Sequence, residues 1–152
     1  MNITKLTDNI EKKKIARKIL EALPEWFRMP AARESYIEES KDKLFFCAYH
    51  EGEPVGFLYF TETGKDTMEL TVMGVMKEYH RKGIGKALFG TAKEEICEMG
   101  YSFIQVKTLK KGIREPYDKT NQFYISLGFK EFEVFPDLWS ADCPCQIYVM
   151  AL

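Results

Sequence analysis

Apolar residues recur at helical spacing in two stretches of the second half of the chain. Between residues 84 and 99 they fall on every fourth position, which predicts a strongly amphipathic helix that ends at Gly100. Another helix is predicted to open at residues 118–120 and to stop at Gly128. Both helices are expected to cover a hydrophobic core with their apolar faces.

Two more helices are predicted near the N-terminus. Thr7 or Asp8 can cap the first one, which carries apolar residues at helical spacing, and Pro24 should end or bend it. A shorter helical segment follows over residues 31–40. Between these two helices lies the stretch LPEWFRMP, residues 23–30, in which two prolines flank a pair of aromatic residues.

Strands are predicted where β-branched and aromatic residues concentrate. Two of these stretches are separated only by Glu51, Gly52 and Glu53, so they are expected to form a hairpin. The predicted strands cover residues 2–6, 43–50, 54–61, 68–76, 101–109, 129–135 and 146–152. The order of helices and strands predicts an α/β (α+β) fold with a mixed central sheet.

Length and charge limit the kinds of protein that fit this pattern. The chain has 152 residues, 45% of them apolar, so we expect a single domain over residues 1–152. A net charge of −1 with interspersed signs argues against nucleic acid or a membrane as partner and favours a small ligand. The N-terminus lacks a signal sequence and no stretch reaches the roughly 20 apolar residues that span a bilayer, so we expect a cytoplasmic protein.

The four cysteines do not form a recognisable metal or redox motif. Cys143 and Cys145 are separated by one residue, whereas common zinc and redox motifs have two residues between their cysteines. We therefore expect free thiols and no metal, with a disulfide or metal site as the less favoured alternative.

The stretch HRKGIGKAL, residues 80–88, places two glycines and several cations between a predicted strand and a predicted helix. Glycine lets backbone N–H groups approach an anion closely, so this loop predicts a phosphate-bearing ligand. A P-loop would need glycine at His80 and Ser or Thr at Ala87. A dinucleotide-binding loop would need a third glycine at Leu88 and an acidic residue roughly twenty residues further on, so neither motif fits.

Two segments together resemble the GCN5-related N-acetyltransferases (GNAT family). The segment VMGVMKEYHRKGIGKAL, residues 72–88, is similar to the family's acetyl-CoA signature, Gln/Arg-x-x-Gly-x-Gly/Ala, with His80 at the leading position. The segment TNQFYISLGF, residues 120–129, is similar to its second signature. The family often has an asparagine seven residues before the tyrosine, where this chain has Tyr117, and Asn121 is the nearer candidate for that polar role.

The resemblance implies the GNAT fold and a cytoplasmic transferase that uses acetyl-CoA. The fold has a twisted, mostly antiparallel sheet of about six to seven strands, flanked by about four helices. The implied acetyl-CoA-binding residues are Met73, Gly74, Val75, His80, Arg81, Lys82, Gly83, Ile84, Gly85, Lys86 and Asn121. In the family, the strand that ends at residues 73–75 separates from its neighbour after a bulge, and an N–H near Val75 could bind the developing oxyanion.

Two residues are candidates for proton transfer. Tyr124 stands where the family places the tyrosine that protonates the departing thiolate, and a phenol is a suitable acid for this step. Glu69 lies eleven residues before His80, the position of the catalytic glutamate in the histone-acetylating branch. A chain of water molecules is the alternative base, and Glu69 could simply face solvent.

The predicted activity is direct transfer of an acetyl group from acetyl-CoA to a primary amine in a ternary complex. No cysteine sits in a recognisable nucleophile setting, which favours direct attack. The alternative is a non-catalytic CoA-binding or regulatory module on the same fold. Trp26, Phe27 and Tyr36 are expected to line the site of a small-molecule or peptide amine acceptor, and the protein is expected to be a monomer or a homodimer.

Overall fold

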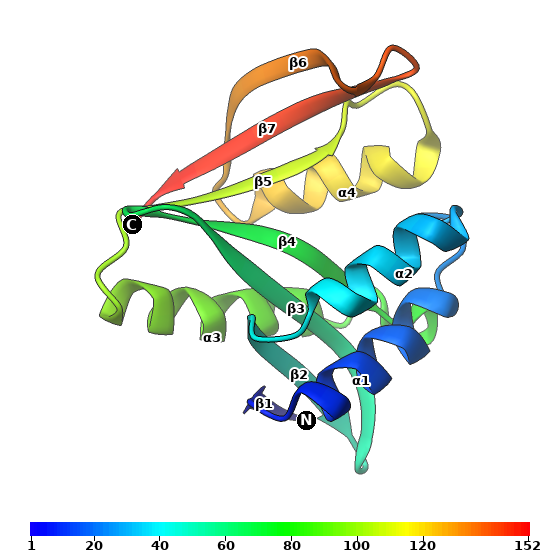
Figure 1. Ribbon diagram of the computed structural model, residues 1–152, viewed down its shortest axis with the longest axis vertical. Helices are drawn as coiled ribbons and strands as arrows, with labels where there is room; N and C mark the ends of the chain where they lie inside the picture. The colour runs from blue at the N-terminus through cyan, green and yellow to red at the C-terminus, as the bar shows by residue number, and fades with distance from the viewer. The chain divides into compact units, whose positions relative to one another are not determined.

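The computed structural model describes residues 1–152, which form two compact units. The first unit comprises Met1–Thr61 and Thr71–Met99, and the second comprises Glu62–Leu70 and Gly100–Leu152. The helices are α1 (Asn9–Glu21), α2 (Pro30–Glu39), α3 (Ile84–Glu98) and α4 (Glu115–Ser126), with a short 3-10 helix η1 (Lys77–Tyr79). The strands are β1 (Asn2–Leu6), β2 (Leu44–His50), β3 (Glu53–Gly64), β4 (Thr67–Val75), β5 (Phe103–Leu109), β6 (Lys130–Ser140) and β7 (Cys143–Ala151) (Figure 1).

The strands form one seven-stranded sheet in the order β1-β2-β3-β4-β5-β7-β6. Strand β4 pairs in parallel with β5, with Glu69 opposite Gln105. The pairs β1–β2, β2–β3, β5–β7 and β6–β7 are antiparallel. The predicted fold, a mixed and mostly antiparallel sheet with four helices, is therefore confirmed.

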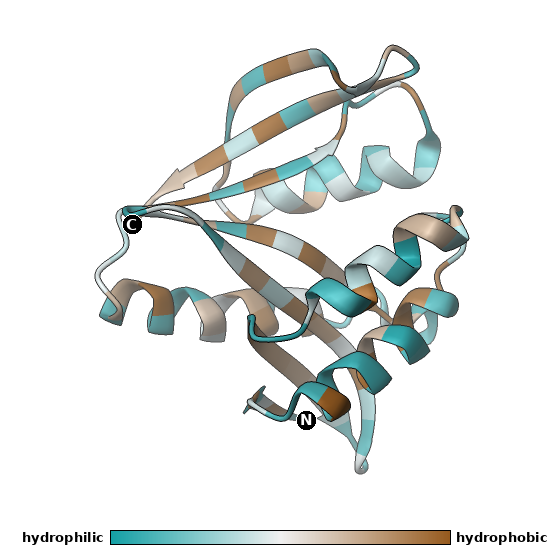
Figure 2. Cartoon of the chain, viewed as in Figure 1, coloured by the Kyte–Doolittle hydropathy of each residue, from teal (hydrophilic) through white to brown (hydrophobic).

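In the first unit, helix α1 packs its apolar side chains against the strands. Asp8, one of the two predicted caps, begins the helix by accepting a hydrogen bond of 2.9 Å from the N–H of Ile10. Figure 2 shows α1 mostly hydrophilic and β2 mostly hydrophobic, as expected for a helix on the surface and a strand in the core. The core residues from both elements include Ile15, Ile19 and Phe45.

Gly74 near the end of β4 is required by the close approach of α1. Its backbone has no positive φ, but a Cβ atom built there would lie 3.0 Å from Ile19 Cγ2 and 3.1 Å from Leu23 Cδ1. A larger residue would push α1 away from the sheet. The lack of room for a side chain therefore explains why position 74 is a glycine.

In the second unit, α4 packs on strands β5 and β7 through a buried polar side chain. Asn121 of α4 is fully buried and donates hydrogen bonds of 3.0 Å to the Leu109 carbonyl and 2.7 Å to the Tyr117 carbonyl. Its Oδ1 accepts a hydrogen bond of 2.6 Å from the hydroxyl of Tyr148 on β7. Because a buried amide is costly unless it is paired, these bonds fix α4 on the strands.

Helix and strand boundaries differ from the prediction in the second half of the chain. Helix α4 begins at Glu115, not at Asp118, because Pro116 has a φ suited to the first helical turn. Strands β6 and β7 extend beyond the predicted ranges, since Ser140 and Cys143 pair at their connection. The 3-10 helix η1 was not predicted.

Candidate functional site

The first group of candidate residues lies at the N-terminus of α3. Gly83 is the N-cap residue, with a left-handed φ of 79°, and it offers no side chain to cap the helix. The N–H of Ala87 makes the first helical bond, 3.0 Å to the Gly83 carbonyl. The N–H groups of Ile84, Gly85 and Lys86 therefore have no carbonyl partner within the helix and are suited to an anion.

Three cationic side chains accompany this helix end. Arg81, Lys82 and Lys86 are all exposed. Arg81 has a left-handed φ of 61°, and the Lys82 ammonium lies 5.5 Å from the centre of the Tyr79 ring. Cationic side chains near these N–H groups add to the attraction of the helix dipole for a phosphate.

The end of β4 carries the next three candidates, Met73, Gly74 and Val75. Burial alternates along this strand, so Gly74 faces α1 while Met73 and Val75 share the opposite face. The peptide unit that joins Val75 to Met76 is hydrogen-bonded at both ends. Its N–H donates to the Val55 carbonyl at 2.9 Å, and its carbonyl lies 2.6 Å from Nε2 of His80.

The three aromatic candidates for the acceptor site also belong to the first unit. Phe27 and Tyr36 contact edge to face with 6.2 Å between ring centres. Trp26 makes a similar edge contact with His80 at 5.6 Å. All three aromatic residues are partly buried against the core, so each leaves part of its surface accessible. Such rings can both complete the core and form a binding wall.

Tyr124 of α4, in the second unit, is almost completely buried. Its side chain is 8% exposed and packs near the rings of Phe129 and Tyr148, at 5.9 Å and 6.2 Å between centres. Burial raises the pKa of the Tyr124 phenol, and the nearby Tyr117 raises it further. The phenol is therefore protonated at neutral pH and can donate a proton.

Glu69 of β4 also lies in the second unit, where Lys107 of β5 is its ion-pair partner. The Lys107 ammonium lies 2.9 Å from Glu69 Oε1, and the glutamate side chain is 14% exposed. The parallel register places Glu69 and Lys107 on the same face of the two strands. The carboxylate therefore has a structural partner in addition to its candidate role as a base.

Asn121 has a different environment from the other predicted acetyl-CoA ligands. Both polar atoms of its side chain are engaged in the buried hydrogen bonds between α4, β5 and β7. The side chain is also fully buried, so it exposes no polar atom to a ligand. We therefore leave Asn121 out of the proposed acetyl-CoA site.

Sequence reasoning missed two side chains that contact the candidates, Lys107 and Tyr148, and it also missed the contacts of His80. His80 was predicted to lie in the phosphate loop, but the partners of its ring could not be read from the sequence. Lys107 could have been found from strand register, since it lies two residues after the partner of Glu69. No sequence pattern indicates the role of Tyr148, because its hydrogen bond to Asn121 depends on how α4 packs on β7.

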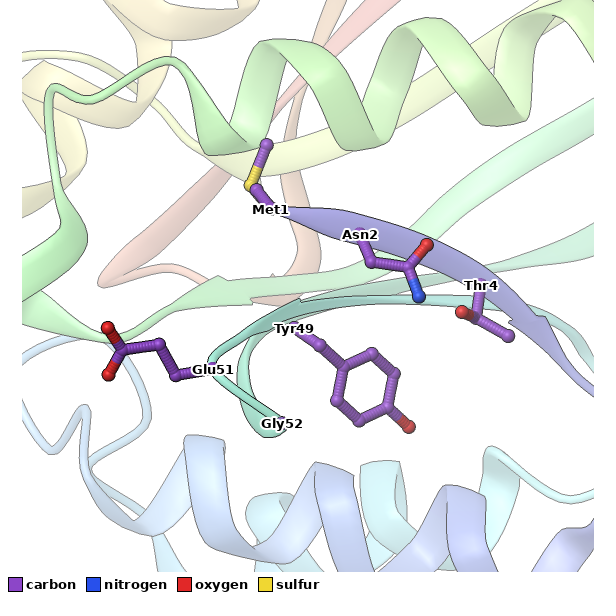
Figure 3. Close-up of a pocket in the computed structure, with 6 residues that line it drawn as sticks. All are labelled: Met1, Asn2, Thr4, Tyr49, Glu51 and Gly52. Carbon is purple, nitrogen blue, oxygen red and sulfur yellow. The ribbon is translucent and has the colours of Figure 1, made fainter.

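An open hollow elsewhere in the first unit involves none of the predicted site residues. It has a volume of about 520 Å³ and is lined by Met1, Asn2, Thr4, Tyr49, Glu51 and Gly52 (Figure 3). The side chains of Tyr49 and Glu51 point to different sides, so they do not converge on one ligand. This hollow is not the candidate site.

No group of three or more His, Cys, Asp or Glu side chains is arranged to hold a metal ion. None of the helices combines the length and the apolar character needed to cross a membrane.

A family model, a related sequence and solved structures each connect this chain with acetyltransferases. A family model described as the acetyltransferase (GNAT) domain matches residues 41–131, more than half of the chain. An uncharacterized N-acetyltransferase of Chlorobaculum tepidum is 30% identical over 112 residues, which are 72% of this chain and 64% of that protein. The matched region thus spans less than two thirds of this relative.

Solved structures show the same fold at lower sequence identity. A structure assigned to the GNAT family from Desulfovibrio desulfuricans has a TM-score of 0.86 at 17% identity, covering 99% of this chain and 98% of that one. An aminoglycoside 6'-N-acetyltransferase complexed with coenzyme A has a TM-score of 0.76 at 20% identity, covering 99% and 97%. The family match and the shared fold agree: this chain belongs to the GNAT family of acetyltransferases.

Proposed function

We propose that this protein is an acetyl-CoA-dependent N-acetyltransferase that acts on a primary amine. The observation that carries the proposal is the α3 N-terminus, where Gly83 leaves the helical N–H groups uncapped within the GNAT acetyl-CoA signature. Backbone N–H groups from Gly83 to Lys86 would bind the pyrophosphate of the donor, with Arg81 and Lys82 as cationic neighbours. The coenzyme A complex of the aminoglycoside enzyme supports the same ligand class.

The proposed reaction is direct attack by the amine on the thioester. The neutral amine nitrogen forms a bond to the acetyl carbon, and an N–H near Val75 stabilises the negative charge on the carbonyl oxygen. The carbon–sulfur bond then breaks, and the departing thiolate takes the phenolic proton of Tyr124. The amine loses its proton to Glu69 or to water, and solvent returns a proton to Tyr124.

The proposed acceptor is a small molecule or a peptide that carries a primary amine. Trp26, Phe27 and Tyr36 are proposed to contact it, because these rings are only partly buried. An aromatic wall favours an acceptor with apolar or cationic groups next to the reacting nitrogen.

A Tyr124→Phe variant tests whether the protein is an enzyme that uses this tyrosine. Loss of the acid should lower kcat by about 100-fold, while acetyl-CoA affinity stays close to that of the wild type. Tyr148→Phe is the matched control, since it removes a buried hydroxyl 2.6 Å from Asn121 but no proposed acid. It should reduce stability by about 1 kcal/mol and leave kcat nearly unchanged.

Acetyl transfer by the wild type distinguishes the proposed enzyme from the alternative function, a non-catalytic CoA-binding or regulatory module. A non-catalytic module would bind CoA without any acetyl transfer, in the wild type as in the variants. An equal kcat in wild type and Tyr124→Phe would remove Tyr124 from the mechanism.

The role of Glu69 can be separated from its ion pair by comparing two variants. Glu69→Gln and Lys107→Met both break the 2.9 Å ion pair. If Glu69 is the base, only Glu69→Gln should lower kcat/KM for the amine, by about tenfold or more at pH 7. Equal kinetic effects in the two variants would assign Glu69 a structural role and leave water as the base.

A further inference from the structure

The imidazole of His80 links two parts of the first unit that the proposed reaction uses separately. Its Nε2 lies 2.6 Å from the carbonyl of Val75, at the end of β4. The edge contact between its ring and that of Trp26, with 5.6 Å between the centres, joins it to the loop between α1 and α2.

This hydrogen bond determines which ring nitrogen of His80 carries a proton. A carbonyl oxygen can only accept, so Nε2 must carry the proton and donate it. The same peptide unit donates its Met76 N–H to the Val55 carbonyl at 2.9 Å. A peptide that is held at both ends cannot rotate, and each hydrogen bond strengthens the other by polarising the peptide group.

A second contact fixes the same turn to the same loop. Lys77, at the start of η1, forms an ion pair with Glu25, the residue before Trp26. The Lys77 ammonium is the main cause that lowers the pKa of the Glu25 carboxyl, with a smaller contribution from His80. Two side chains of the Lys77–His80 turn thus contact two consecutive residues of the loop between α1 and α2.

We propose that His80 is a positioning residue, which holds the Val75–Met76 peptide and couples it to Trp26. In this assignment the His80 side chain is not a phosphate ligand. The end of β4 adjoins the N–H group that is proposed to bind the acetyl oxygen, and Trp26 is one of the three aromatic residues proposed to contact the amine acceptor. The identity of both ligands therefore rests on the proposed function. Through His80, a change at the acetyl group is transmitted to the amine side of the site.

Two substitutions of His80 remove its contacts with Val75 and with Trp26 one at a time. His80→Phe keeps an aromatic ring beside Trp26 but removes the donor to Val75. His80→Gln keeps an N–H donor at a position similar to Nε2 but removes the ring. Acetyl-CoA and CoA serve as ligands in calorimetric titrations, because only acetyl-CoA carries the carbonyl oxygen that the strand end is proposed to bind.

The titrations should distinguish the two ligands. We expect His80→Phe to raise the Kd of acetyl-CoA about fivefold and the Kd of CoA less than about twofold, as for the loss of one hydrogen bond. His80→Gln should restore acetyl-CoA affinity to within about twofold of wild type. Equal weakening of both ligands would make His80 a phosphate ligand, and unchanged affinities with lowered stability would make it purely structural; either result overturns the proposal.

Tryptophan fluorescence tests the coupling to Trp26. The chain has two tryptophans, and Trp139 is an exposed residue of β6, so Trp139→Phe leaves Trp26 as the only reporter. Saturating acetyl-CoA should change the Trp26 emission in this background. Adding His80→Gln should remove most of that change although the ligand still binds; a full response would overturn the coupling.

Nitrogen NMR tests the hydrogen bond without any ligand. The chain has two histidines, and a His50→Gln variant assigns their signals. The imidazole of His80 should be found with its proton on Nε2. A neutral ring with its proton on Nδ1 would contradict the proposal even if acetyl-CoA binds, whereas failure of the wild type to bind either ligand would instead contradict the proposed function.

Discussion

At the residue scale, the environment of Tyr124 sets the pH range over which its phenol can act as an acid. Burial raises its pKa above the value of about 10 that tyrosine has in an unfolded chain. The phenol therefore remains protonated in the folded protein at any pH where an enzyme of this type would operate. The raised pKa keeps the proton on the phenol until the thiolate is released, and it also makes the phenol a weaker acid toward that thiolate than an ordinary tyrosine.

This shift has a consequence for stability, whose sign follows from proton linkage. The folded protein holds the Tyr124 proton more tightly than the unfolded chain does, so the contribution to stability is complete below pH about 10 and is lost as pH rises toward the folded pKa. The free energy of unfolding should thus fall more steeply above pH 10 in the wild type than in Tyr124→Phe. Urea unfolding of both proteins at pH 8 and pH 10.5 measures this difference, and parallel pH dependences would show that Tyr124 is not buried.

At the element scale, helix α3 and its preceding loop carry the donor site. Gly83 at the N-terminus has φ 79° and Gly100 beyond the C-terminus has φ 91°, and neither has another group within 4 Å of a Cβ position. The two glycines are therefore under the same backbone constraint, but only Gly83 belongs to the proposed phosphate site.

Substituting each of these glycines by alanine tests the assignment of the α3 N-terminus. Both variants should lose about 1 kcal/mol of stability, because an L-residue is strained at positive φ. Gly83→Ala should also weaken CoA binding by about tenfold or more, since its methyl group meets the approaching phosphate, while Gly100→Ala should bind normally. Calorimetry with CoA provides the comparison. Equal affinities would place the pyrophosphate elsewhere.

Local patterns predicted most elements, and contacts across elements accounted for most of what was missed. The four-residue repeat defined α3, and Gly100 marked its end, because both signals lie within one segment. The start of α4 was misplaced by three residues, since the proline that suits its first turn was interpreted as part of a loop. The Glu69–Lys107 pair depends on strand register, and the His80–Val75 bond depends on a turn that has no sequence signature.

At the scale of the whole molecule, the two units divide the proposed chemistry between them. The first unit contains the α3 N-terminus, the end of β4 and the aromatic wall, which are proposed to bind donor and acceptor. The second unit contains Tyr124 and Glu69, which are proposed to transfer protons. Strands β3 and β4 each contribute residues to both units.

The most direct test of the central claim is to follow an isotopically labelled acetyl group from acetyl-CoA. The protein is incubated with labelled acetyl-CoA and a panel of free amines, polyamines, aminoglycosides and peptides with free N-termini. The masses of the products are then measured by mass spectrometry. The account predicts that at least one amine gains one labelled acetyl group, that one CoA thiol is released for each, and that Tyr124→Phe slows both. Intact acetyl-CoA with every amine, together with no measurable binding of acetyl-CoA, would contradict it.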